Sequence, residues 1–95
     1  LSEGHIPVVV RVHAARREEL LDAARAVRTE EAESNGWVRL EVTFEDLRHA
    51  LWAIWQLDTD AEVLAPDTLR VALHDRATTL AARYDSHPGA WRMKA

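Results

Sequence analysis

The sequence predicts an α+β domain in which four antiparallel strands and two helices follow the order strand-helix-strand-strand-helix-strand, with a third helix at the end. Three observations support this class. Apolar and polar residues alternate toward the end of 7–13 and strictly over 37–43, as expected for strands with one buried face. Later stretches repeat apolar residues at helical spacing. The dipeptide Asn35-Gly36 predicts a tight hairpin turn.

The first strand is expected over 7–13, because this segment is rich in β-branched residues. Its inner face carries Val8, Val10 and Val12. From Ala14 to about Arg25 the residues become good helix formers, so an amphipathic helix should follow the strand directly. The apolar positions of that helix are Leu20, Leu21 and Ala24.

The segment 26–33 is compatible with two structures. It could prolong the first helix, or it could form one arm of a hairpin that turns at Asn35-Gly36. The other arm, 37–43, is clear, and its inward residues are Val38, Leu40 and Val42.

The second helix is expected to begin within 43–46, where Thr43 and Asp46 resemble a capping box. Its predicted buried stripe consists of Phe44, Leu47, Leu51, Ile54 and Trp55. Truncation of Leu40 or Leu51 to Ala should therefore cost on the order of 2–5 kcal/mol if both lie in the core.

A short strand over 61–65 ends at Pro66, which cannot donate to a ladder but suits the first turn of a helix. The third helix is expected from about Pro66 to Tyr84. Its predicted buried stripe consists of Leu69, Leu73, Ala77, Leu80 and Tyr84. The expected division is a linker from a missing N-terminal part at 1–6, a domain at 7–84 and a tail at 85–95.

This order is the split βαβ pattern of a ferredoxin-like fold, in which two helices cover one face of the sheet. The opposite face is left without a cover, and such a face needs a lid, a ligand or another chain. The residues expected on it are Val9, Arg11, His13, Trp37, Arg39, Glu41 and Leu64.

Composition narrows the classes of function. The net charge is −4 without a long block of either sign, so direct binding of this chain to a phosphate backbone is not expected. The absence of cysteine excludes disulfides and thiolate chemistry and fits the cytoplasm. The five histidines lack the spacing of a zinc motif, and no nucleophile lies at a readable distance from a base. We expect no catalytic residues, no metal and no cofactor.

The segment from Val63 to Arg70 reads Val-Leu-Ala-Pro-Asp-Thr-Leu-Arg and follows a helix that ends in Trp55-Gln56-Leu57. This succession resembles the C-terminal extension, or WCX domain, of WYL-type bacterial transcription regulators, and the resemblance covers nearly the whole chain. Members of that family usually turn into the last strand through a glycine, where this chain has Asp58. Asp tolerates a left-handed backbone better than most residues, so the fold should survive the change.

The resemblance implies a parent protein with an N-terminal winged helix-turn-helix, a central WYL domain that senses a ligand, and this domain at its end. It implies roles in dimer assembly and in the effector response, with DNA bound only through the N-terminal part. The expected partners are a second subunit, the parent's own WYL domain and an anionic effector, with no membrane. The alternative is a stand-alone or enzyme-attached ferredoxin-like module that binds a small molecule.

The predicted partner- or ligand-binding residues are Arg11, His13, Trp37, Arg39 and Arg70. Arginine and tryptophan are the types enriched at binding hot spots, and arginine can hold a phosphate or carboxylate with two hydrogen bonds. The alternative is that Arg11 and Arg39 only pair with Glu41 and Glu62 on a solvated sheet. For Arg70, a purely structural place at the start of the third helix is the alternative.

Overall fold

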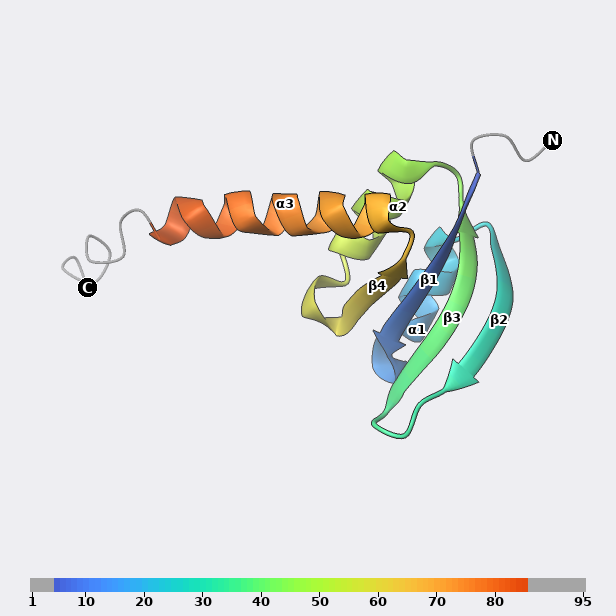
Figure 1. The fold of residues 1–95 in the computed structure, drawn as a ribbon. Helices are drawn as coiled ribbons and strands as arrows, with labels where there is room; N and C mark the ends of the chain where they lie inside the picture. The colour runs from blue at the N-terminus through green and yellow to red at the C-terminus, as the bar shows by residue number, and fades with distance from the viewer. Residues whose placement is uncertain (1–4, 86–95) are drawn as a thin grey trace.

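The computed structural model describes residues 5–85, which form a four-stranded antiparallel sheet and three α-helices, the last of them C-terminal. The α+β class is confirmed. Figure 1 shows α1 and α2 behind the sheet and α3 leaving the body to one side. The elements in chain order are β1 (Ile6–His13), the 3-10 helix η1 (Ala14–Arg16), α1 (Arg17–Ala23), β2 (Ala26–Ala32), β3 (Trp37–Phe44), α2 (Leu47–Trp55), the 3-10 helix η2 (Asp58–Asp60), β4 (Ala61–Ala65) and α3 (Asp67–Asp85).

The strands lie in the order β2-β3-β1-β4, so β1 and β3 form the centre of the sheet. Their register pairs Val10 with Leu40 and Val12 with Val38. The segment that the sequence left open, 26–33, is a strand: β2 pairs with β3 along its length, with one irregularity after Val27. β2 remains an edge strand, and all of its residues are exposed.

Alternation along β1 and β3 divides the sheet into a buried face and an open face. The buried face packs against α1 and α2, while no helix among the described residues lies over the other face. The buried residues within 5–85 are all apolar: Val8, Val10, Val12, Leu20, Val38, Leu40, Val42, Phe44, Ala50, Ala53, Ile54, Leu57, Val63 and Leu69. The core is therefore one layer between the sheet and the two short helices.

The start of α2 differs from the prediction. The strand β3 continues to Phe44, which pairs with Ile6, so Thr43 cannot cap a helix. The cap is Asp46, whose side chain accepts a hydrogen bond from the backbone N–H of His49 at 2.8 Å. The face of α2 in the core is correspondingly rotated, because Ala50 and Ala53 are buried whereas Leu47 is 38% exposed. Of the other predicted stripe residues, Ile54 is buried while Leu51 and Trp55 are half-buried.

The predicted buried stripe of α3 is wrong beyond its first turns. Leu69 is buried and Leu73 is half-buried, but Ala77, Leu80 and Tyr84 are exposed. The reason is the direction of the helix, which projects from the body instead of lying along the sheet (Figure 1). The boundaries of α3 agree with the prediction, and the part of the expected tail beyond Asp85 lies outside the described residues.

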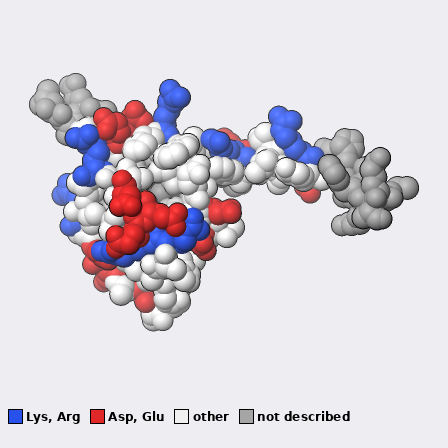
Figure 2. Space-filling model, turned by 180° about the vertical axis from the view of Figure 1, so that it is seen from behind, with Lys and Arg blue, Asp and Glu red and all other residues white. Residues whose placement is uncertain are grey.

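Ion pairs join α1 to its neighbours. Arg17 donates hydrogen bonds to Glu30 of β2, and these lower the pKa of the Glu30 carboxyl. Arg16 reaches Asp60 at 2.9 Å and also pairs with Glu19. Figure 2 shows the result, a face on which acidic groups gather beside a row of basic ones. Each exposed ion pair of this kind contributes little to the free energy of unfolding. These pairs therefore fix the orientation of α1 more than they stabilise the fold.

Two turns depend on left-handed backbone. Gly36 has φ of 85° in the hairpin between β2 and β3, where the Asn35 side chain also accepts a hydrogen bond from the backbone N–H of Trp37 at 3.2 Å. Asp58 has φ of 61°, so the aspartate does occupy a position that favours glycine. None of the helices within residues 5–85 is long and apolar enough to cross a membrane.

Truncation of the central strand tests the core. We expect Leu40→Ala to lower the free energy of unfolding by about 2–5 kcal/mol, because Leu40 is fully buried between the sheet and the helices. The control Val71→Ala, at a position 57% exposed, should change it by less than about 0.5 kcal/mol. Urea unfolding followed by circular dichroism measures both, and a loss at Leu40 below about 1 kcal/mol would contradict the face assignment.

The turn at Asp58 gives a second prediction. Asp58→Val should lower the stability by about 1–2 kcal/mol, since a β-branched residue tolerates a positive φ poorly. Asp58→Gly should stay within about 0.5 kcal/mol of the parent chain, because glycine adopts this conformation readily but loses more entropy on folding. Thr59→Val is the matched control, and equal thermal shifts for Asp58→Val and Thr59→Val would show that the backbone conformation does not matter.

Candidate functional site on the open face of the sheet

The pairing of β1 with β3 places four of the five predicted site residues on the open face. Arg11 lies opposite Arg39, and His13 lies opposite Trp37. In an antiparallel sheet directly paired residues are near neighbours on the same face. The prediction that these four residues share a face is therefore consistent with the register, and what each of them binds remains a proposal.

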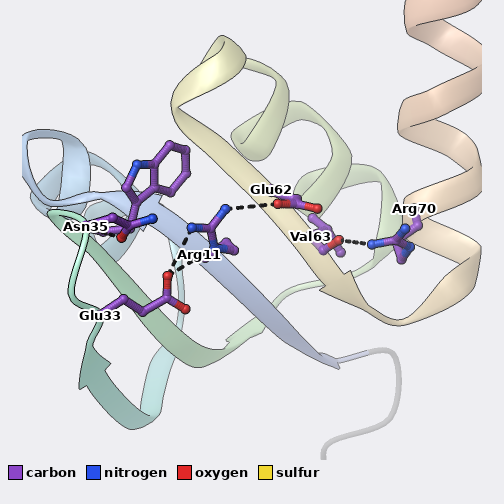
Figure 3. Close-up of polar contacts among 7 residues, drawn as sticks. Arg11, Glu33, Asn35, Glu62, Val63 and Arg70 are labelled. Carbon is purple, nitrogen blue, oxygen red and sulfur yellow. Dashed lines mark hydrogen bonds and ion pairs between the residues drawn. The ribbon is translucent and has the colours of Figure 1, made fainter.

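Arg11 is the centre of a network that spans three strands and a turn. Its Nε and Nη2 atoms donate to Glu33 Oε1 at 3.2 and 3.0 Å, and its Nη1 donates to Glu62 Oε1 at 3.1 Å (Figure 3). The hydrogen bonds that Arg11 donates to both carboxylates, that to Glu33 foremost, raise the pKa of Arg11 further above its ordinary value. The guanidinium is thus permanently charged and already holds two acidic partners.

Trp37 packs against the same guanidinium. The Arg11 Cζ atom lies 4.4 Å from the Trp37 ring centroid, which is the geometry of a cation–π contact. The ring of His13 meets Trp37 edge-on at 6.0 Å between centroids. We call Arg11, His13, Glu33, Trp37 and Glu62 the Arg11 cluster. It fixes the orientation of a large indole that is only half-buried.

Arg39 differs from Arg11 although the two are cross-strand neighbours. Its side chain is exposed and forms no ion pair with any residue in the part of the chain that the structure describes. The register also places it opposite Glu31 on β2, but no ion pair joins them. Glu41, the other acid expected to pair here, lies 3.6 Å from Arg28 instead. Arg39 is therefore a cation next to the Arg11 cluster that is available to a partner.

Arg70 is not brought together with the other predicted residues. It lies on α3, and its Nη1 donates to the backbone oxygen of Val63 at 2.7 Å (Figure 3). β4 is an edge strand, so no neighbouring strand within residues 5–85 bonds to its outer side. The hydrogen bond from Arg70 satisfies one of its backbone oxygens. Arg70 also lines a hollow of about 300 Å³ between α3 and β4, together with Glu62 and His74. Its visible contact is a structural one.

Glu33 is the member of the Arg11 cluster that the sequence did not reveal. It follows β2, and its backbone N–H donates to the oxygen of Trp37 at 2.8 Å across the hairpin. The signal that could have found it is the turn itself, because Asn35-Gly36 places residues 33 and 37 opposite each other. Glu62 had been considered as a partner of Arg11, and that pair is present.

The side chains on this face can make ionic, hydrogen-bonding and aromatic contacts with a partner. In residues 5–85 no group of three or more histidines or acids is placed to hold a metal ion. The arrangement offers a fixed aromatic ring, a free guanidinium and acidic groups that are partly neutralised by Arg11. Such a surface suits a protein partner or an anionic group.

Comparison with protein-family models matches residues 4–81 to the WCX domain. The chain belongs to the WCX domain family. The match includes the entire sheet and most of α3, and the resemblance carried by the segment from Val63 to Arg70 is confirmed. A search of curated proteins finds no match to this WCX domain. Its association with WYL-type regulators rests on the family.

The contrast between the two arginines generates a test of this WCX domain. Arg11→Met should lower the free energy of unfolding measurably, because it removes two partly exposed ion pairs and one cation–π contact. Arg39→Met should change it by less than about 0.5 kcal/mol, because no contact is lost. Denaturant unfolding measures the pair, and equal losses would mean that the cluster does not stabilise the sheet.

Proposed function

We propose that this WCX domain is the C-terminal assembly and effector-response part of a bacterial, cytoplasmic WYL-type transcription regulator. It is non-catalytic, and operator DNA is bound by a helix-turn-helix in another part of the regulator. The family match supports the regulator context. The order of its elements and the strand order β4-β1-β3-β2 support a ferredoxin-like fold for it.

The open face of the sheet is the surface that we assign to the regulator's WYL domain. The observation that carries this assignment is the combination of a half-buried Trp37, held by Arg11, with an unpaired Arg39 beside it. Aromatic and arginine anchors of this kind contribute most of the energy at protein interfaces. A regulator that senses an effector in its WYL domain could transmit the change through this contact to a second subunit.

The experiment uses the full-length regulator with Arg39→Ala, which removes a free cation without disturbing the fold. We expect the melting temperature to stay unchanged. The affinity for the operator should change by about tenfold, because the free energy of one charged hydrogen bond corresponds to a factor of this size. Trp37→Ala should act in the same direction. Arg48→Ala, an exposed arginine on α2, which lies on the other side of the sheet, is the control. Unchanged operator affinity in both the Arg39 and the Trp37 variants, with the fold intact, would contradict the assignment.

A further inference from the structure

The outer half of α3 carries apolar side chains on one side that no other element within residues 5–85 covers. At 100° per residue, Ala77, Leu80 and Tyr84 fall on one side of the helix, with Arg83 along its edge. Leu80 is 45% exposed and Tyr84 is 70% exposed. We call this face the α3 arm. A helical segment of this length is marginal on its own in water, so it gains stability from any surface that covers it.

A groove lies on the opposite side of the molecule from the open sheet face, between α1 and α2. It is an open hollow with a volume of about 560 Å³, and its apolar wall includes Ala23, Ala53, Leu57 and the large ring of Trp52. Trp52 is 56% exposed, although it stacks on His49 with ring centroids 6.2 Å apart. An apolar groove of this kind, with a tryptophan in its wall, suits an amphipathic helix.

The rim of the groove is acidic. Glu19 and Asp22 of α1 line it, and acidic groups are gathered on this face in Figure 2. The hydrogen bond from Arg16 lowers the pKa of Glu19, so this carboxylate stays ionised at neutral pH. Asp22 forms no ion pair with the described residues. The α3 arm carries the opposite charge at Arg83, which is likewise unpaired within residues 5–85.

The same chain cannot easily bring these two surfaces together, because α3 points away from α1 (Figure 1). Pairing of two α3 arms with each other is also disfavoured. The spacing of Ala77 and Leu80 would allow an antiparallel pair, but the flanking Arg76 of one helix would then lie beside Arg83 of the other. Arg76 is in addition engaged with Trp55, at 4.9 Å from the ring centroid. Charge therefore favours the acidic groove as the surface that receives the arm.

We propose that the α3 arm of one copy lies in the α1–α2 groove of a second copy, and that a two-fold axis makes the exchange reciprocal. Leu80 and Tyr84 cover Trp52, and Arg83 lies against Asp22, which has no ion-pair partner among the described residues. The two-fold arrangement buries both arms and both grooves at once and leaves no open end for a chain of subunits. This inference rests on the assembly role proposed above and names the surfaces that carry it out.

Charge reversal in the 95-residue chain tests the exchange, with the mass measured by sedimentation equilibrium over a concentration series. We expect the wild-type chain to dimerise, and Arg83→Glu or Asp22→Arg alone to raise the dimer Kd by about tenfold or more, because each places like charges together. The double variant, which restores opposite charges, should return the Kd to near its original value. Leu80→Ser should weaken the dimer as well.

The control is Val71→Ser, since Val71 is 57% exposed on the same helix but points about 180° away from Leu80. Its dimer should be unchanged, and circular dichroism of every variant should show the parental helix content. A monomeric wild-type chain, a dimer insensitive to all three single variants, or single losses without rescue in the double variant would each overturn the exchange. The effect of Arg39 on operator affinity in the regulator is independent of these outcomes.

Discussion

The register between the two central strands is the constraint on which the remaining structure depends. Val10 pairs with Leu40 toward the helices, and one residue later Arg11 pairs with Arg39 toward the open face. A slip by one residue would move Arg11 into the core and the valines into solvent. The residues of β1 and β3 on the buried face, among them Val8 and Val42, are all apolar. Such a slip is therefore costly, because it would place charged side chains in the core. Every contact of the Arg11 cluster is a consequence of this pairing.

Local signals in the sequence were sufficient for β1, β3 and β4 but not for β2. In β1 and β3 a period of two leaves no choice of face. This alternation alone predicted which face of the sheet carries Arg11, His13, Trp37 and Arg39. The hairpin at Asn35-Gly36 was also readable, since it depends on the conformational preference of particular residues. The left-handed backbone at Asp58 was indicated only by the family resemblance, in which a glycine usually stands at this position. The partner of Arg11 across the hairpin, Glu33, was not readable, because it depends on which way segment 26–33 folds.

The failure on α3 has a different cause. Its spacing of Leu73, Ala77, Leu80 and Tyr84 predicted a covered face, and a periodic pattern does not specify which chain provides the cover. In this domain the body covers only the start of the helix. The error at α2 is smaller: Asp46 was assigned to the third helical position, but continued pairing of β3 with β1 makes it the cap.

Some arginines of this domain stabilise the fold through ion pairs, and others are free to contact a partner. Arg11, Arg16 and Arg17 are each committed to carboxylates that connect neighbouring elements, whereas Arg39 and Arg83 are free within the described residues. Arg39 and Arg83 lie on two different surfaces, the open sheet face and the α3 arm. We therefore assign contact with the WYL domain to the first and contact with a second copy to the second, so that the two contacts do not compete.

The most direct test of the central claim is the accessibility of Trp37, measured by oxidative footprinting of the full-length regulator and of the 95-residue chain at equal concentration. If the open face contacts the regulator's WYL domain, oxidation of Trp37 should be several-fold slower in the regulator, while oxidation of Trp55, which lies off that face, should be unchanged. Equal rates at Trp37 in the two proteins would show that the open face is free in the regulator and would contradict the assignment.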